Sequence, residues 1–449
     1  MFTDVTYQDW QAAADRDKLL LTAIDRYKAS RDFGLALEAG DYFRGRNPAV
    51  ARKTVLRARK IETRDASGRK RIRTGTEDVV GNRIGSGFLF RFITQQNQFL
   101  LANGCVLADA QTKALLGADF DHQLAALGER ALIHGVSWGF WNVDHLEVLE
   151  AARDIRSGFF ALMDELTDEP MVGVQFWQIS ADKPMYVRLF ETDGVTVLKL
   201  EKGMPVPVMP KRPYVVTMRS DALGDEILST ENYARLPIIP LFANSERHSE
   251  LTPAIKAKID AYDNILSDFA DNLDRANDVY WVLNNFGGTT DDIAQMLEEI
   301  QRIKAVANLS DGSGSSSTAE PHTIEVPYAA RQTALDILER ALYQDYMALN
   351  IDALTGGSLT NVAIRAATAN LNLKADRYEW QVFRFVQQLL ALLGVTTEEI
   401  RFPRQCIANE SETVADIAAM RPDIDRRTAL KLNPYIQPEE IDALLRGEA

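Results

Sequence analysis

The chain has 449 residues, more than one compact core usually holds, so we expect several domains of roughly 100–200 residues each. Apolar residues form 46% and charged residues 25% of the sequence, a balance typical of folded globular proteins that argues against disorder. The two cysteines, Cys105 and Cys406, lie far apart, which argues against a disulfide framework or a thiolate metal site and fits a reducing compartment. No secretory signal or apolar run near the ~20 residues of a membrane span is visible, so we expect a soluble protein without a membrane partner.

The net charge of −14 is unevenly distributed along the chain. Residues 44–73 carry twelve Lys or Arg against two acidic residues, and DASGRKR within them predicts a turn between two short strands. Such a block can neutralise DNA phosphates, or it can pair with acidic patches of a neighbouring subunit. The sequence leaves both interpretations open for the candidate contact residues, which are Arg57, Arg59, Lys60, Arg69, Lys70, Arg71 and Arg73.

The first half of the chain predicts helices followed by an antiparallel sheet. Residues 4–43 have partial helical spacing, and NRIGSGFLFRFITQQNQFLLANG predicts a buried helix that ends at Asn103-Gly104. Residues 120–135 predict a further helix, and the strand-like VSWGFWNVDH follows it. Between residues 171 and 240, β-branched and aromatic runs alternate with turn residues, which predicts a sheet. RLPIIPLFAN then predicts an extended segment.

Residues 250–276 predict an amphipathic helix. Its apolar residues recur at steps of three and four and define a face that must be buried: Ile255, Ile259, Tyr262, Leu266, Phe269 and Leu273. Five aspartates fall between them, so we expect the remaining surface of the helix to be strongly anionic. These residues are Asp260, Asp263, Asp268, Asp271 and Asp274.

Two further helices are predicted after a small insertion. VYWVLNNFGG predicts a strand and a turn, Thr290 is a candidate N-cap of a short helix, and DGSGSSST is expected to be flexible. The second helix spans about residues 328–348, and after LTGGSLT the third spans about 361–393. A strand at IRFPRQ and short helices complete the chain. The fold class predicted from these elements is α+β, predominantly helical.

No motif in the sequence predicts catalysis, a metal or a cofactor. GNRIGSG resembles a phosphate-binding glycine loop but lacks the G-x-x-x-x-G-K-[ST] pattern, so a structural turn is favoured. The five histidines show no zinc-ligand spacing. We therefore expect a protein that is not an enzyme and binds no cofactor.

The order of several motifs resembles the SPP1-like family of phage portal proteins. The resemblance is carried by NRIGSGFLFRFITQQNQFLLANG, ALIHGVSWGFWNVD and, most specifically, RLPIIPLFANSERHSELTPAIKAKIDAYDNILSDFADNLDRANDVYWVL. GGSLTNVAIRAATANLNLKA and the C-terminal IRFPRQCIANESE with RRTALKLNPYIQPEEIDAL are also similar to that family. The matching order extends from about residue 80 to the end of the sequence.

The resemblance implies a domain order for this chain. A wing would comprise residues 1–248, a stem two helices at 249–276 and 328–347, and a clip residues 277–327. A tunnel loop at 348–361 would be followed by a long wing helix and a returning strand at 362–404, and by a crown at 405–449. The loop residues expected to meet DNA are Asn350, Asp352, Thr355, Gly356, Gly357, Ser358, Leu359, Thr360 and Asn361.

The same resemblance implies a function and partners. The chain would form a ring, a dodecamer in the virion, through which double-stranded DNA is packaged and ejected at a capsid vertex. Expected partners are the large terminase subunit, the head-completion adaptor, and scaffolding and major capsid proteins, with assembly in the host cytoplasm. An anionic channel wall would let DNA slide because it prevents counterion-releasing contacts with phosphates. The alternatives are a nuclease-like DNA-processing enzyme and another connector or adaptor ring of the virion.

Overall fold

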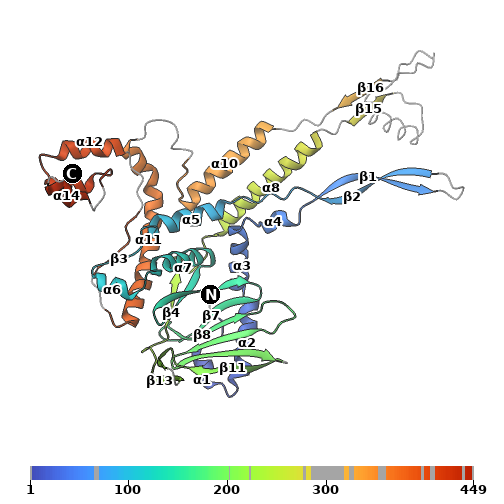
Figure 1. Cartoon of the computed structure of the whole chain (residues 1–449). Helices are drawn as coiled ribbons and strands as arrows, with labels where there is room; N and C mark the ends of the chain where they lie inside the picture. The colour runs from blue at the N-terminus through green and yellow to red at the C-terminus, as the bar shows by residue number, and fades with distance from the viewer. Residues whose placement is uncertain are drawn as a thin grey trace, which may run out of the picture. The chain divides into compact units, whose positions relative to one another are not determined.

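The computed structural model describes most of the chain. The described residues are 3–64, 70–201, 203–221, 224–276, 280–284, 318–322, 328–351, 360–395, 399–404, 410–436 and 440–446, without side chains for 56–64, 70–77, 220–221, 224–226, 274–276, 280–284 and 318–322. The chain forms two compact units: one comprises residues 1–44, 87–255 and 343–449, and the other comprises residues 45–86 and 256–342 (Figure 1). Each unit is described separately below.

The first unit is built on a six-stranded antiparallel sheet in the order β11-β10-β9-β8-β7-β6. Its strands are β6 (Ala152–Asp154), β7 (Ser157–Met163), β8 (Pro170–Trp177), β9 (Tyr186–Glu191), β10 (Gly194–Glu201) and β11 (Met204–Arg212). One face is covered by the N-terminal helices α1 (Tyr7–Ala12), α2 (Arg16–Ala29) and α3 (Arg31–Phe43). Tyr27 anchors this layer, because its ring packs on Phe33 and Phe160 while its hydroxyl donates to the carbonyl of Ala151.

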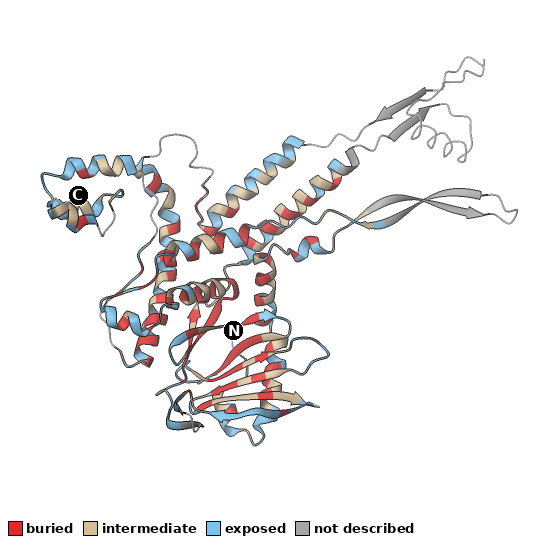
Figure 2. Cartoon of the chain, viewed as in Figure 1, coloured by how far each residue is buried: buried red, intermediate tan, exposed pale blue. Residues whose placement is uncertain are grey.

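The other face of the sheet packs on a second, three-stranded sheet in the order β14-β4-β5. Those strands are β14 (Ile238–Phe242), β4 (Val136–Asn142) and β5 (His145–Glu150). Successive residues of β7 serve the two layers, with Phe160 facing the helices and Phe159 facing Trp138 of β4. Both faces of the large sheet are therefore apolar, and Figure 2 shows buried residues along its central strands.

Two helices, α7 (Phe120–His134) and the long α11 (Asn361–Leu392), pack on the smaller sheet, and a third, α5 (Phe88–Leu101), packs on both of them. Helix α7 ends at Gly135, whose φ of 89° is the left-handed geometry that glycine adopts without strain, and the chain then enters β4. Gly139 of β4 leaves room for the ring of Phe385 on α11, since a Cβ there would collide with it.

The remaining elements of the first unit are short. They are β3 (Val106–Leu107), α6 (Ala110–Leu115), β12 (Val215–Asp221), β13 (Gly224–Glu231), β17 (Ile400–Arg401), α12 (Glu410–Met420), α13 (Arg426–Leu432) and α14 (Ile441–Arg446). β12 pairs with β13, and β17 pairs with β3.

The second unit combines a β-hairpin with helical segments. Helix α4 (Pro48–Ala51) leads into β1 (Thr54–Arg64), which pairs antiparallel with β2 (Lys70–Val80). The chain returns to this unit in α8 (Pro253–Ala276), continues through the paired strands β15 (Tyr280–Asn284) and β16 (Thr318–His322), and leaves it along α10 (Tyr328–Tyr346). Phe269 of α8 and Tyr328 of α10 make an edge-to-face ring contact, with centroids 5.7 Å apart.

Most predicted elements are present. The structure confirms the three helices near 250–276, 328–348 and 361–393, the helix before Asn103-Gly104, the antiparallel sheet and the hairpin around DASGRKR. The strands of that hairpin are longer than the short strands predicted, at 11 residues each. Thr290 and residues 311–317 lie outside the described residues. Strands β5, β6 and β7 were not predicted. Helix and strand are both abundant, so the chain is a mixed α+β protein, and the prediction that it is predominantly helical is not confirmed.

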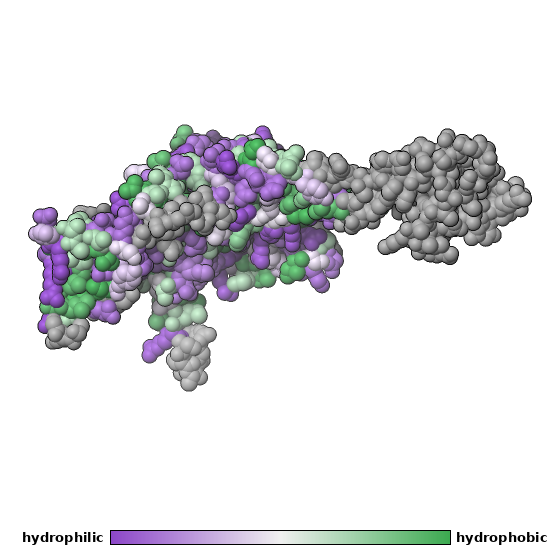
Figure 3. Space-filling view, turned by 90° about the horizontal axis from the view of Figure 1, so that it is seen from above, coloured by the Kyte–Doolittle hydropathy of each residue, from purple (hydrophilic) through white to green (hydrophobic). Residues whose placement is uncertain are grey.

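The surface of the described chain is mixed in character. Hydrophilic and hydrophobic residues are intermingled on the face shown in Figure 3. On α11, three large apolar side chains are more than half exposed: Val362 at 74%, Leu373 at 58% and Trp380 at 67%. Their separations of eleven and seven residues place them on one face of the helix. None of the described helices is long and apolar enough to cross a bilayer.

The turn between β4 and β5 generates a first prediction. Val143 adopts φ 60°, which is costly for a β-branched residue. Replacing Val143 with Gly should raise the free energy of unfolding of the first unit by about 1 kcal/mol, seen as a higher thermal midpoint. Val143→Ala is the control and should recover less, since alanine keeps the Cβ that disfavours this φ. A lower midpoint for Val143→Gly would contradict this account of the turn.

Candidate functional site

The predicted acidic helix, α8, binds the segment that follows the hairpin. Residues 81–87 belong to no helix or strand, so their backbone N–H groups need other acceptors. The N–H of Asn82 donates to Asp271 Oδ1 at 2.7 Å, that of Ile84 to Ser267 Oγ at 3.1 Å, and that of Ser86 to Asp263 Oδ1 at 2.9 Å. We call residues 82–86 the strap, because they lie along α8 through these three bonds.

The spacing of these bonds follows from the geometry of the two partners. Asp263, Ser267 and Asp271 are four residues apart, which advances about 6 Å along a helix. The donors in the strap are two residues apart, which advances about 6.6 Å in extended backbone. The strap therefore runs antiparallel to α8, and helix side chains take the place that a neighbouring strand would have in a sheet.

Each end of the strap has further polar contacts. Asp263 Oδ2 accepts a bond of 2.7 Å from Asn47 Nδ2, while Asn47 Oδ1 caps α4 by accepting from the N–H of Ala49. At the other end Asp271 Oδ1 also accepts from Asn82 Nδ2 at 2.9 Å, and Lys53 Nζ lies 2.6 Å from Asp268 and 3.4 Å from Asp271. Burial raises the pKa of Asp263, opposed by the bonds from Asn47 and Ser86.

The glycines of GNRIGSG have a structural role in this arrangement. A Cβ on Gly85 would collide with the backbone carbonyl oxygen of Gly45, and one on Gly81 would lie 3.0 Å from a carboxylate oxygen of Asp271. The two glycines therefore allow close approach of backbone to backbone and of backbone to carboxylate. The motif therefore has a structural role, but it forms a strap along α8 rather than the predicted turn.

The expected acidic surface of α8 needs correction at two positions. Asp263 is 0% exposed and Asp271 is 8% exposed, so neither lies on the surface of the chain. They are buried because the strap requires acceptors for its N–H groups. Asp268 is exposed and pairs with Lys53, and Asp260 lies 3.4 Å from Lys256 Nζ. The side chain of Asp274 lies outside the described part of the chain.

The apolar face of α8 is only partly covered within the chain. Ile255 and Ile259 are buried, but Tyr262, Leu266 and Phe269 are half-buried and Leu273 is 42% exposed. The prediction of a buried face is thus correct for the first two turns alone. On α10, Leu342 and Tyr346 are buried, Leu335 and Leu338 are half-buried, and Ile337 is 60% exposed.

The segment that leaves α10 is anchored to α5. Helix α10 ends in a Schellman-type turn, in which the N–H of Ala348 donates to Tyr343 O and Met347 adopts φ 65°. Gln95 then makes two bonds to the backbone of Leu349, donating to its carbonyl at 3.0 Å and accepting from its N–H at 2.9 Å. The amides that interrupt the apolar pattern of α5 therefore bind the start of the predicted loop.

The residues predicted for the loop fall into three groups. Asp352, Thr355, Gly356, Gly357, Ser358 and Leu359 lie outside the described residues. Asn350 is half-buried. Thr360 and Asn361 belong to the start of α11, where Thr360 Oγ1 caps the N–H of Ala363 and the backbone N–H of Asn361 donates to Glu412 of α12.

The basic residues of the hairpin are placed by their backbone only. Arg57, Arg59 and Lys60 lie in β1, and Lys70, Arg71 and Arg73 lie in β2. Thr63 pairs with Arg71 and Ile61 with Arg73 in the antiparallel register. Arg69 lies outside the described residues. The choice between DNA and a neighbouring subunit therefore stays open.

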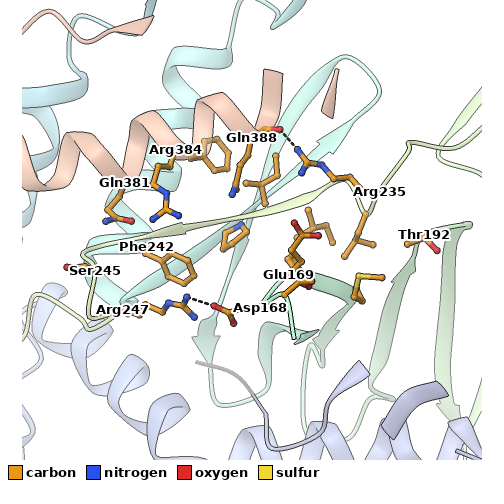
Figure 4. A pocket seen from close by; sticks show the side chains of 18 of the residues that line it. Asp168, Glu169, Thr192, Arg235, Phe242, Ser245, Arg247, Gln381, Arg384 and Gln388 are labelled. Atoms are coloured by element: carbon orange, nitrogen blue, oxygen red, sulfur yellow. Dashed lines mark hydrogen bonds and ion pairs between the residues drawn. The ribbon is translucent and has the colours of Figure 1, made fainter. Parts of the chain in front are cut away.

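A pocket of about 530 Å³ lies in the first unit between α11, β14 and residues 167–171 (Figure 4). Arg247 forms an ion pair with Asp168, and Arg235 donates to the carbonyl oxygen of Gln388 at 2.8 Å. None of the residues predicted for the loop, the acidic helix or the basic block lines this pocket.

Comparisons with known proteins place the chain in a protein family. The profile of the family described as "Phage portal protein, SPP1 Gp6-like" matches residues 26–448. The portal protein of Clostridium phage phiCD119 is 28% identical over 225 residues, 48% of this chain and 49% of that protein. The portal protein of Bacillus phage SPP1 is 28% identical over 273 residues, 57% of this chain and 50% of that protein. The chain thus spans about half the length of the curated relatives it matches.

Because the profile covers nearly all of the sequence, the chain belongs to the SPP1 Gp6-like family of phage portal proteins. The contacts described above join the motifs that carried the resemblance. Asn82 and Ile84 of the NRI motif bind Asp271 and Ser267 of the helix motif, and Gln95 holds the segment before the third helix.

The strap generates a second prediction. Asp263→Ala should lower the stability of the contact between the strap and α8 by about 2 kcal/mol, because the part-buried Ser86 N–H and the buried Asn47 Nδ2 both lose their acceptor. Hydrogen exchange of residues 82–86 measures this loss. Asp260→Ala, on the same helix, is the control and should cost less than about 0.5 kcal/mol. Equal protection of residues 82–86 in both variants would disprove the role of Asp263.

Proposed function

We propose that this chain forms the portal ring of a tailed-phage capsid, a closed channel through which double-stranded DNA is packaged and ejected. Membership of the portal family over residues 26–448 carries this proposal. In this assignment α8 and α10 are the stem helices, residues 277–327 the clip and 348–361 the tunnel loop. Residues 1–248 and 362–404 form the wing, and 405–449 the crown. Residues 45–86, within the proposed wing, share a compact unit with residues 256–342, which hold most of α8 and α10.

Incompletely covered apolar faces support assembly into a ring. On α8, the half-buried Leu266 and Phe269 and the exposed Leu273 continue the buried stripe toward the C-terminal end of the helix. On α11, Val362, Leu373 and Trp380 form an exposed stripe. A neighbouring copy that covers such stripes gains roughly 25 cal/mol for each Å² of apolar surface removed from water. Side-by-side packing of copies would supply this burial, and the dodecamer remains the expected number in the virion.

The proposed anionic channel wall has fewer contributors than the sequence suggests. Asp263 and Asp271 are buried in the contact with the strap and cannot face a channel. Among the described side chains of α8, Asp260 and Asp268 remain as candidates, each beside one lysine. Their lysine partners reduce the repulsion of phosphate without turning α8 into a strongly cationic surface.

The remaining parts of the proposal concern partners and chemistry. The ring would act as a structural conduit rather than an enzyme, and the terminase large subunit would hydrolyse ATP on its own chain. The head-completion adaptor would replace the terminase after packaging, and scaffolding and major capsid proteins would surround the ring. Assembly would take place in the host cytoplasm before the ring becomes part of the virion.

Electron microscopy of the purified protein tests the ring. Negative-stain images should show closed rings with a central hole wide enough for a DNA duplex, about 20 Å across. A monodisperse monomer under all conditions would contradict the portal assignment. A nuclease assay with Mg²⁺ or Mn²⁺ separates the enzyme alternative, since a portal ring should leave the DNA intact.

The channel wall generates a third prediction. The double variant Asp260→Lys and Asp268→Lys should reduce the fraction of DNA-filled capsids on the order of tenfold, because added cations would bind phosphates of the passing duplex. Rings should still assemble. Asp25→Lys on the exposed side of α2 is the control for a change of charge and should package normally. Wild-type packaging by the double variant would show that these two aspartates do not line the channel.

A further inference from the structure

Lys374, a largely shielded lysine of the first unit, contacts the roots of both proposed stem helices, by which we mean the start of α8 and the end of α10. Lys374, in the middle of α11, places its Nζ 2.7 Å from Glu250 Oε2 and 2.9 Å from the carbonyl oxygen of Tyr346. Glu250 lies three residues before α8, and Tyr346 is the last residue of α10. The Lys374 and Glu250 side chains are only 14% and 12% exposed.

The side chain of Tyr346 is held by three contacts. Lys374 Nζ lies 3.2 Å from the centroid of the Tyr346 ring, the ring stacks on Phe92 at 4.6 Å, and its hydroxyl donates to Gln96 Oε1 at 2.8 Å. Helix α5 therefore contacts the end of α10 from one side, and α11 contacts it from the other.

The chemistry of lysine suits this position. A helix leaves its last carbonyl oxygens without internal partners, and a cation near them also favours the negative end of the helix dipole. At the end of α10, the backbone N–H groups of Ala348 and Met347 donate to the carbonyl oxygens of Tyr343 and Gln344. The ammonium group of Lys374 donates to the carbonyl oxygen of Tyr346. An ammonium group carries three donors around one charge, so it can bind this carbonyl and the Glu250 carboxylate together. An apolar residue could do neither.

We propose that Lys374 is a positioning residue that couples the start of α8 to the end of α10, so that the two helix roots keep one arrangement against α11. The consequence for DNA packaging rests on the proposed portal function, but the coupling itself does not. Removing one partner of a buried ion pair leaves the other charged and unpaired, so a change at one root is transmitted through Lys374 to the other.

Hydrogen exchange on the full-length protein tests the coupling. Lys374→Met keeps the length and apolar stem of the side chain but loses its charge and donors. We expect amide exchange to accelerate at least tenfold both at residues 249–256 and at 343–351, with residues 120–134 of α7 unchanged. Arg377→Met is the matched control, one turn further along α11, because Arg377 pairs with Glu246 at the surface, where its side chain is 70% exposed. It should leave both roots protected.

Glu250→Gln is the second variant and keeps the test decisive if Lys374→Met does not fold. It removes a charge next to α8, and the described hydrogen bonds and ion pairs of the Glu250 side chain go to Lys374 and Asn244 rather than to α10. Faster exchange at residues 343–351 therefore supports coupling through Lys374. Faster exchange near residue 250 alone, or at neither root, would overturn the proposal. If exchange accelerates at both roots while capsids fill with DNA normally, the coupling through Lys374 is supported. The result then contradicts either the portal function or its dependence on this coupling.

Discussion

The arrangement of the second unit depends on one requirement, that the backbone N–H groups of the strap find acceptors outside any sheet. Asp263, Ser267 and Asp271 supply them at the four-residue spacing of a helix, which matches the two-residue spacing of extended chain. A buried carboxylate is costly unless several donors surround it, and here each aspartate accepts at least two bonds. The helix and the strap therefore satisfy each other's hydrogen-bonding groups.

This requirement changes the electrostatic description of the proposed stem. A count of aspartates on α8 suggests a uniformly anionic rod, whereas the structure assigns two of them to internal hydrogen bonds and places lysines beside two others. The apolar stripe of α8 changes in the opposite sense along the helix. It is buried at Ile255 and Ile259 and is increasingly exposed beyond them. The face of α8 that is buried within the chain becomes polar where the strap lies. In the proposed ring, the uncovered apolar residues would pack against another copy.

In the first unit, too, polar side chains bind backbone groups that have no partner within a helix or sheet. Gln95 and Gln96 interrupt the apolar pattern of α5, and both bind the end of α10 or the residues after it. Lys374 completes that end from α11. The predicted loop thus begins at a position held by α5 and α11. Such an anchored start fits a loop that would have to meet moving DNA at a defined place.

The sequence by itself determined the helices, the antiparallel sheet, the hairpin and the family, because periodicity, turn residues and ordered motifs are local signals. Ile255 and Ile259 were identified as core residues from their spacing alone. Only the tertiary structure decided that Asp263 and Asp271 are buried and that Glu250, Tyr346 and Lys374 meet. The sequence alone does not distinguish an aspartate on a solvated helix face from one buried beneath the strap. The burial of Asp263 and Asp271 depends on the strap, whose N–H donors lie 177 and 189 residues away in the sequence. Strand β7 was missed for a related reason, since it is buried on both faces and lacks the alternation that marks a half-exposed strand.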